Sequence, residues 1–223
     1  MKFFPLIIII FFSCSKGEIS KSRVRVVSLA PSLTEIVFAL RRGDDLLGVT
    51  TFCNYPAQAA KKYKVGDFSN PSLERIVTVK PDIVLVTIPE QTRIKNELEK
   101  LKIKTYNSSP ATIGDIFKDI MTIGQILNAS DRADSLIDSL RDELARVTQI
   151  LVTDTPKVYL EISPQPLVSV GSSSYINEMI CLAGGKNIFG DLGVDYPVIS
   201  QEELLKRNPD IIFILHDARV GQR

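Results

Sequence analysis

The sequence predicts an α/β protein with two similar lobes, each a parallel sheet with flanking helices, joined by one long helix. Three observations predict this arrangement. Strand-like and helix-like patterns alternate along the 223 residues, which is typical of parallel sheets with right-handed crossovers. One sequence unit occurs twice, at residues 72–87 and 200–215. A long helical pattern without Gly or Pro separates the two copies.

The long helix is predicted at residues 131–153. Its apolar residues recur every three to four positions, which is the period of a helix with one buried stripe, and Asp142 and Arg146 form a favourable i,i+4 pair. Pro156 prevents its continuation. An ordinary long surface helix would show the same pattern, so the flanking units decide between the two. The predicted stripe consists of Ala133, Ile137, Leu140, Leu144, Val147 and Leu151.

The repeated unit aligns without a gap, as SLERIVTVKPDIVLVT and SQEELLKRNPDIIFIL. Each copy reads as a short amphipathic helix, a Pro-Asp turn and an apolar run that we expect to be a strand buried on both faces. A weaker match relates residues 35–37 to residues 178–180. The two lobes are therefore predicted to be Rossmann-like siblings. Matched positions include Ser72 with Ser200, Glu74 with Glu202, and Pro81-Asp82-Ile83 with Pro209-Asp210-Ile211.

The first lobe is predicted to span residues 24–128. Ser32 with Glu35, and Thr112 with Asp115, have the spacing of capping boxes that open two of its helices, and Gly43 follows the first of them. The predicted strands are 23–29, 46–50, 83–87 and 103–106, and the predicted helices are 32–40, 57–62, 72–79, 91–102 and 112–127.

The second lobe is predicted to span residues 156–223, after a linking helix assigned to residues 129–155. Its last strand is followed only by a short polar tail, so we expect the lobe to be incomplete, as a truncated gene product or an unusually small lobe. The predicted elements are a strand at 157–162 that a Pro-Gln-Pro run breaks, its continuation at 167–170, a helix capped by Ser172-Ser173-Ser174 and ending near Ala183, a helix opened by Ser200 and Glu203, and a strand at 210–215.

The N-terminus resembles an export signal. About ten apolar residues follow Met1-Lys2, which is too few to span a bilayer but suits the apolar part of such a signal. Ser13-Cys14 resembles the bacterial lipoprotein cleavage box, although Phe11 stands where Leu is usual. We expect lipidation of Cys14, with plain secretion or an uncleaved anchor as alternatives. Residues 1–23 are interpreted as signal and polar tether, outside the fold.

Composition argues against several other classes of protein. The net charge is +1, and no clustered basic face marks a nucleic-acid binder. Cys53 and Cys181 have no CxxC spacing, so no metal or redox motif is predicted; we expect free thiols, although a bridge would tie the lobes together. The serines at 172–174 lack a GxSxG turn, no phosphate loop is present, and His216 is the only histidine. Catalysis is therefore not predicted.

Four runs carry a resemblance to a known family: VVSLAPSLTEIVFAL, YPAQA, VGDFSNPSLERIVTVKPDIVLV and AGGKNIF. They resemble the periplasmic cobalamin-binding protein and its siderophore- and haem-binding relatives, the class III substrate-binding lipoproteins of ABC importers. The resemblance covers residues 24–215. It implies two lobes joined by a rigid backbone helix, a monomer on the periplasmic side of a membrane in the cell envelope, and ABC permease and ATPase subunits as partners.

The resemblance also implies a ligand cleft between the lobes, at the carboxyl ends of the strands, which agrees with the rule for open α/β sheets. Corrinoid binders place aromatic rings against the macrocycle, and the matching positions are Phe52, Phe68 and Tyr196. Thr87 stands where relatives have tryptophan. Haem relatives use Tyr or His on iron, and Tyr55 is the nearest candidate. The ligand is expected to be cobalamin, a ferric siderophore or haem, with no resident metal or cofactor. The alternative for Phe52 and for Phe68 is that the side chain only packs within its own lobe.

Glu74 and Glu202 form a second pair of interest. In the resembled family, one acidic residue on each lobe docks onto arginines of the permease, and these two glutamates occupy equivalent positions of the repeat. The alternative is that each only stabilises the first turn of its helix, where a carboxylate contributes about 0.3–1 kcal/mol.

A further interpretation of the whole chain is a truncated lipoprotein that folds poorly and binds nothing.

Overall fold

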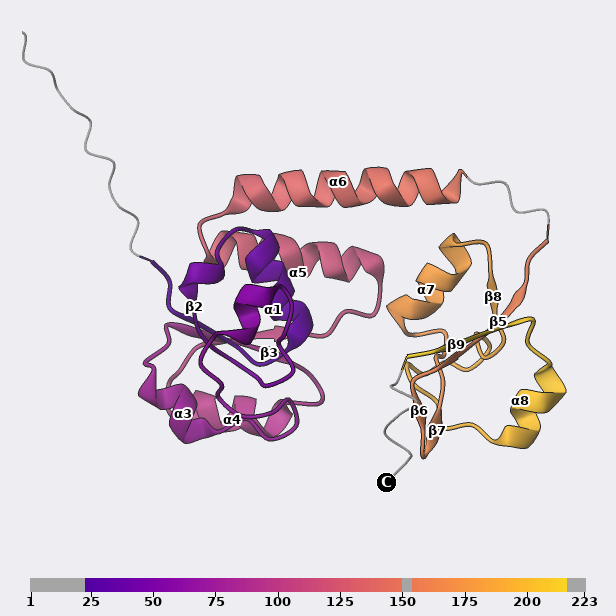
Figure 1. The fold of residues 1–223 in the computed structure, drawn as a ribbon, viewed down its shortest axis with the longest axis horizontal. Coiled ribbons are helices and arrows are strands. Elements are labelled where there is room, and N and C mark those ends of the chain that lie inside the picture. The colour runs from indigo at the N-terminus through magenta and orange to yellow at the C-terminus, as the bar shows by residue number, and fades with distance from the viewer. Residues whose placement is uncertain (1–22, 150–153, 216–223) are drawn as a thin grey trace, which may run out of the picture.

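The computed structural model describes residues 23–149 and 154–215, and within them two α/β lobes flank one long helix (Figure 1). The first lobe contains a parallel sheet in the order β2-β1-β3-β4. Its strands are β1 (Val26–Ser28), β2 (Leu46–Val49), β3 (Ile83–Thr87) and β4 (Thr105–Ser108), and its helices are α1 (Pro31–Ala39), η1 (Gly43–Asp45), α2 (Ala57–Ala60), α3 (Leu73–Thr78), α4 (Thr92–Lys100) and α5 (Ile113–Ile126).

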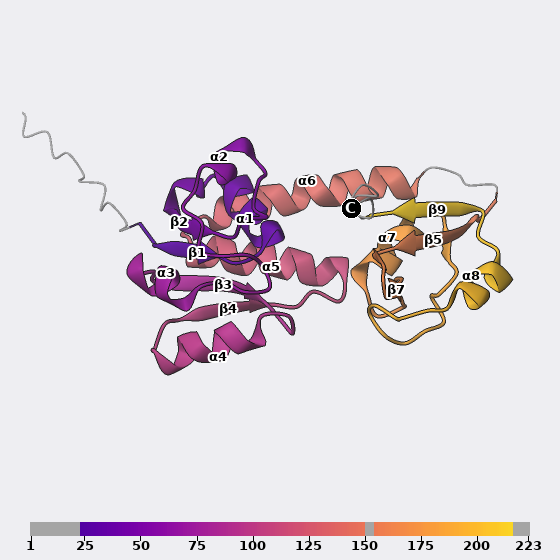
Figure 2. The ribbon, with the colours of Figure 1, turned by 60° about the horizontal axis from the view of Figure 1, so that its bottom comes forward.

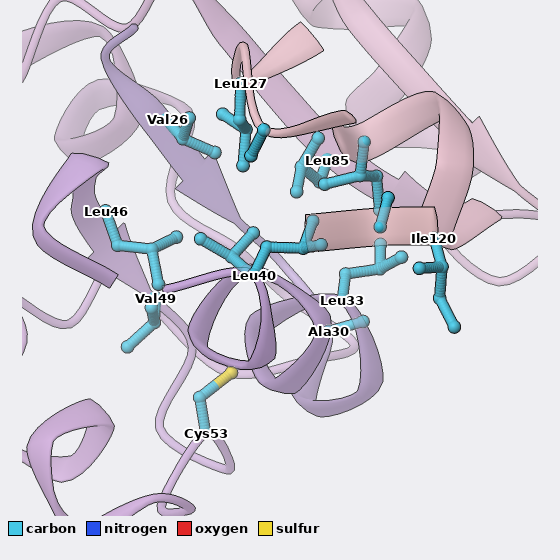
Figure 3. Close-up of a cluster of buried hydrophobic side chains, with 14 of the residues drawn as sticks. Val26, Ala30, Leu33, Leu40, Leu46, Val49, Cys53, Leu85, Ile120 and Leu127 are labelled. Atoms are coloured by element: carbon cyan, nitrogen blue, oxygen red, sulfur yellow. The ribbon is translucent and has the colours of Figure 1, made fainter. Parts of the chain in front are cut away.

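Both faces of the first sheet are covered, as the near-continuous apolar runs of β1 and β3 require. On one face Val26 and Leu85 pack with residues of α1, α5 and the long helix (Figure 3). On the other face Val27 and Val84 pack with residues of α3 and α4, among them Ile76. Successive residues of a strand therefore enter opposite halves of the core.

The second lobe has a smaller parallel sheet in the order β8-β5-β9, and an antiparallel pair β6-β7. Tyr159 and Phe189 are its largest fully buried side chains and meet edge to face, with ring centroids 6.2 Å apart. Its strands are β5 (Lys157–Glu161), β6 (Ser163–Pro164), β7 (Leu167–Val168), β8 (Lys186–Asn187) and β9 (Ile211–Ile214), and its helices are α7 (Tyr175–Leu182) and α8 (Gln201–Arg207).

The linking helix α6 spans Ser130–Thr148, and residues 150–153 of the predicted helix lie outside the described residues. Of the predicted stripe, Ala133 and Ile137 are buried, whereas Val147 is 43% exposed. The expectation of a continuously buried stripe was therefore wrong, because the second half of α6 extends beyond the first lobe (Figures 1 and 2). The predicted pair of Asp142 with Arg146 was wrong, because the Arg146 guanidinium lies 3.9 Å from the Glu143 carboxylate instead.

The repeated unit is a structural repeat as well. In the first lobe the Asp82 carboxylate accepts a hydrogen bond from the Arg25 backbone N at 2.8 Å, and the Asp82 N donates to the Arg25 carbonyl at 2.8 Å. In the second lobe Asp210 makes the same two bonds with Lys157, at 2.7 and 2.8 Å. Each aspartate therefore fixes the start of its own strand beside the central strand of its lobe.

The expectation that both copies end in a fully buried strand was wrong for the second copy. Val84, Leu85 and Val86 of β3 are fully buried, whereas Ile212 of β9 is 58% exposed and Phe213 is 50% exposed. In the first lobe β4 pairs with the outer edge of β3. Among the described residues no strand pairs with the outer edge of β9, so this strand is left open.

Local signals were correct at most helix starts. Thr112 and Asp115 form the predicted reciprocal capping box, and Ser200 accepts a hydrogen bond from the Glu203 N. Ser32 does not cap α1, which begins at Pro31 after Ala30 and has no side-chain cap. The reason is that proline has its helical φ fixed in advance and lacks the N–H that a cap would satisfy. Within the described residues no helix combines the length and apolar character needed to cross a membrane.

Candidate ligand-binding cleft

A cleft lies where the carboxyl ends of β1, β3 and β4 face the second lobe. Its free space is about 750 Å³, including the open mouth. The first lobe contributes the loops that follow these three strands, and the second lobe contributes the start of α7 and the loop that contains Tyr196. The lining residues are Ala30, Pro31, Ser32, Phe68, Thr87, Ile88, Pro89, Glu90, Ser108, Ser109, Pro110, Ser174, Tyr175, Asp195 and Tyr196.

Gln91, just after this lining, ties the first-lobe loops together. Its Nε2 donates to the carbonyls of Leu29 and Phe68, both at 2.9 Å, and its Oε1 accepts from the Thr87 N at 3.0 Å. The side chain is 2% exposed, and a buried amide with three bonds holds its neighbours in fixed positions. Gln91 therefore sets the spacing between Phe68 and Thr87. Sequence reasoning did not single it out, because two of its three partners are distant in the chain.

Phe68 is presented by a tight turn. Gly66 has φ of +120°, and a Cβ there would lie 2.8 Å from both the Asn70 carbonyl oxygen and the Ser72 nitrogen, so only glycine is accommodated without strain. The Asp67 carboxylate accepts from the Asn70 N at 2.6 Å and closes the turn. The Phe68 ring packs partly against the first-lobe core and also lines the cleft.

The second-lobe wall depends on Gly171. A Cβ at this position would lie 2.0 Å from the Val194 carbonyl oxygen, so the loop before Tyr196 packs directly on the glycine backbone. The Gly171 N donates to the Asp195 carbonyl at 2.9 Å, and the Ser169 N donates to the Pro197 carbonyl at 3.0 Å. These bonds hold Asp195 and Tyr196 at the cleft even though the loop has no regular structure.

Tyr175 is a cleft residue that the sequence did not reveal. It is the first residue of α7, whose N-cap Ser174 accepts from the Ile176 N at 3.2 Å. Burial raises the pKa of the Tyr175 hydroxyl, and the nearby Tyr196 raises it further. The phenol is therefore neutral at physiological pH and can donate a hydrogen bond to a ligand.

Phe68, Thr87 and Tyr196, three of the predicted ligand residues, line this one cleft, and their ligand role stays a prediction. Phe52 is 62% exposed and Tyr55 is 67% exposed, and neither is among the residues that line this cleft. Phe52 belongs to the loop after β2, which joins the Phe68 loop through a 2.9 Å bond from the Thr51 N to the Gly66 carbonyl. Its ligand role, like that of Tyr55, stays a prediction.

One hydrogen bond connects the lobes beside the cleft. The Glu178 carboxylate on α7 accepts from the Ile113 N at 2.8 Å, at the first turn of α5, where a negative charge is favoured by the helix dipole. Figure 2 shows α7 next to the N-terminal end of α5. No sequence pattern predicts this bond, because it joins residues 65 positions apart.

Glu74 and Glu202 are exposed residues in the first turns of α3 and α8. Both helices lie on the side of the lobes away from α6 (Figure 1). Ser72 and Ser200, respectively, cap the two helices, so capping does not require either glutamate.

Cys53 and Cys181 are free thiols, as predicted, the first buried and the second exposed. Cys53 Sγ lies 3.2 Å from the hydroxyls of both Thr34 and Thr50, so it belongs to the first-lobe core. Among the described residues no group of three or more His, Cys, Asp or Glu is placed to hold a metal ion. Cys14 and His216 lie outside the described residues.

Two α/β lobes joined by one long helix, with loops of both lobes lining a cleft, have the architecture of a substrate-binding protein. The chain belongs to the periplasmic binding protein family, whose model matches residues 26–221. It is 31% identical over 211 residues to the vitamin B12-binding protein of Photorhabdus laumondii, covering 94% of this chain and 77% of the relative.

Two further relatives have the same architecture or role. An uncharacterized ABC transporter substrate-binding lipoprotein of Bacillus subtilis is 32% identical over 204 residues, covering 87% of this chain and 64% of the relative. The crystal structure of the periplasmic vitamin B12-binding protein of Vibrio cholerae superposes with a TM-score of 0.76 at 27% identity, covering 90% of this chain and 80% of that one. The resemblance inferred from sequence motifs is thereby confirmed.

Proposed function

We propose that this protein captures a cobalamin-type metal chelate in the cleft between its lobes and delivers it to an ABC permease. The observation that carries the proposal is the cleft itself, in which Phe68 of one lobe and Tyr175 and Tyr196 of the other provide aromatic surface. Aromatic faces give a large, flat, mostly apolar ligand contact area at little entropic cost. The named vitamin B12-binding relatives support the same ligand class.

Direct binding tests this ligand class. The chain contains six tyrosines and no tryptophan, and Tyr175 and Tyr196 line the cleft, so quenching of tyrosine fluorescence is followed while cyanocobalamin, haem and ferric siderophores are titrated in turn. We expect cyanocobalamin to bind with a dissociation constant below about 10 μM, equivalent to roughly −7 kcal/mol. Binding of haem or a siderophore alone would move the protein to another ligand class of the same fold, and binding of none would refute ligand capture.

Substitutions of residues that line the cleft test whether the ligand binds there. Tyr196→Ala and Phe68→Ala are each expected to weaken cyanocobalamin binding about tenfold, within the range measured for interface aromatics. Tyr63→Ala is the matched control, because Tyr63 is an exposed aromatic residue that does not line the cleft. Equal loss of affinity in the control would indicate that the ligand binds elsewhere.

Glu74 and Glu202 are proposed to dock the loaded protein onto the permease. Their support is exposure, equivalence in the repeat and placement on one side of the molecule. Glu74→Ala and Glu202→Ala should leave ligand affinity unchanged and abolish stimulation of ATP hydrolysis by the reconstituted permease and ATPase. Glu143→Ala on α6 removes an exposed carboxylate elsewhere and should keep the stimulation. Loss of ligand binding in the docking variants would contradict this role.

We also propose that the mature protein is a monomer anchored by lipid at Cys14, on the periplasmic side of a membrane. The proposal rests on the apolar run before Ser13-Cys14. Cys14→Ser should move the protein from the membrane pellet to the soluble fraction and abolish incorporation of labelled fatty acid. Unchanged fractionation would favour an uncleaved anchor.

A further inference from the structure

The charged residues that line the cleft are Glu90 and Asp195, both acidic. Glu90 follows β3 in the first lobe, and Asp195 precedes Tyr196 in the second, so each wall contributes one carboxylate. Both residues are exposed, and neither side chain has a hydrogen-bond or ion-pair partner among the described residues. The described lining contains no lysine, arginine or histidine that would neutralise them.

No other side chain of the lining is charged, and the N-termini of α1 and α7, which also lie in it, oppose the field of the two carboxylates only with partial positive charge. A concave site with low-dielectric walls concentrates such a field, and a ligand of the same sign is repelled during approach and in the bound state. Because both carboxylates are exposed, the repulsion is screened by salt over about 10 Å at 0.1 M.

The wall also has an unpaired neutral polar atom. Oγ1 of Thr87 is buried and has no hydrogen-bond partner, although Thr87 lines the cleft. A hydroxyl can both donate and accept a hydrogen bond, so a polar group at the ligand edge would pair with it once the atoms that cover it shift. The Thr87 hydroxyl therefore does not discriminate by charge, and the charge class of the ligand rests on Glu90 and Asp195.

We propose that Glu90 and Asp195 are specificity residues that select metal chelates without net negative charge. Chelates with amide or hydroxyl edges are favoured, and chelates with free carboxylates or catecholates bind more weakly. The inference rests on the proposed function, because it concerns the same cleft and adds the charge class of the ligand.

The test uses two corrinoids of nearly the same shape. Cyanocobalamin is neutral overall, and hydrolysis of one peripheral amide gives a monocarboxylate of the same macrocycle. Binding of each to the full chain is measured by equilibrium dialysis, with corrinoid absorbance as the readout. We expect the monocarboxylate to bind about tenfold more weakly at low ionic strength, the size of effect that an exposed like charge produces at short range, and the gap to narrow as salt is added.

Variants then assign the effect to these two residues. In Glu90→Gln/Asp195→Asn the two affinities should agree within about twofold, whereas Asp134→Asn, which removes an exposed charge from α6, should keep the wild-type ratio. Equal affinities in the wild type, or an unchanged ratio in the double variant, would overturn the charge selection alone. Failure of both corrinoids to bind the wild type would overturn the proposed ligand class as well. The salt dependence in the wild type tests the charge selection even if the double variant does not fold.

Discussion

The two lobes begin alike and end differently. β2-β1-β3 corresponds to β8-β5-β9, and in each lobe a Pro-Asp turn fixes the start of β3 or β9 to the start of β1 or β5. The first lobe then adds α4 and β4, and β3 is buried between its neighbours. In the described part of the second lobe no element follows β9, and its residues are exposed. Two nearly identical sequence patterns therefore have opposite burial, because burial of a strand depends on what packs around it.

The exposed strand leaves an apolar hollow beside it. Phe213 of β9 and Met179 of α7 face this hollow, and both are at least half exposed. The equivalent face in the first lobe, that of Leu85, is filled by Ile120 and Ile123 of α5. The missing packing is therefore on a face as well as on an edge of the second sheet.

Matched truncations of the two strands test the comparison most strongly. Leu85 and Phe213 are equivalent in the repeat, but Leu85 is fully buried and Phe213 is 50% exposed. Leu85→Ala should lower the free energy of unfolding by about 2–5 kcal/mol through lost burial and a cavity, whereas Phe213→Ala should cost about 1 kcal/mol. Urea unfolding followed by circular dichroism measures both, and equal losses would mean that β9 is covered in solution.

The next largest effect on the free energy of unfolding is expected at Asp119, which holds β4, the strand that the second lobe lacks among the described residues. Asp119 on α5 accepts hydrogen bonds from the Tyr106 and Ser108 hydroxyls of β4, both at 2.6 Å, and is 8% exposed. Asp119→Ala leaves two hydroxyls without their acceptor and should cost about 2–3 kcal/mol. Tyr106→Phe removes one of the bonds and should cost about 1 kcal/mol. A thermal-unfolding series that ranks these two variants in the reverse order would refute this account of the fourth strand.

The serine caps of the repeat should contribute equally. Ser72 accepts from the Arg75 N at 3.3 Å, and Ser200 accepts from the Glu203 N at 3.1 Å. Each change to alanine should lower stability by about 1 kcal/mol, and Ser69→Ala, at an exposed loop serine, should have almost no effect. If only one cap matters in urea unfolding, the lobes are not equivalent at this helix.

The smallest effect concerns acid stability. Arg25 donates to the Asp82 carboxylate through both its side chain and its backbone N, which lowers the pKa of Asp82 to about 2. The unfolded pKa is about 3.9, so this contribution is fully present above that pH and is lost as the pH falls toward about 2. Asp82→Asn should be only slightly less stable than the wild type near pH 6, because the ion pair is half exposed. The difference should largely disappear as the pH falls toward about 2, because Asp82 becomes protonated there.

Urea midpoints of the two proteins along the acid limb measure that difference. A gap that does not change with pH would show that the charge of Asp82 contributes nothing, and the absence of any gap would show that the backbone bonds, which asparagine can also make, account for the whole contribution of Asp82.

Sequence reasoning predicted the fold well because its main signals are local. Periodicity located α6, and capping residues located the starts of α5 and α8. The exposure of β9 was beyond such signals, since it depends on neighbouring elements and not on the strand's own residues. The two-residue strand β8 is too short to leave a pattern.

The site was predicted only in part for a similar reason. Family motifs pointed to Phe68, Thr87 and Tyr196, and the fold brings these three together. Gln91 acts through a carbonyl 62 positions earlier, and Tyr175 reaches the cleft because Ser174 starts a helix there. Neither placement follows from a motif, because both depend on how distant loops meet.

The hydrogen bond between Glu178 and the first turn of α5 has a consequence for ligand capture. Any motion that separates the two lobes breaks this bond between a carboxylate and a backbone N–H, which is among the stronger kinds of hydrogen bond. The bond therefore favours one spacing between the two lobes. Binding of a ligand that matches this spacing costs less conformational entropy, because the lobes are already positioned. A rigid, disc-shaped ligand benefits most from such preorganisation.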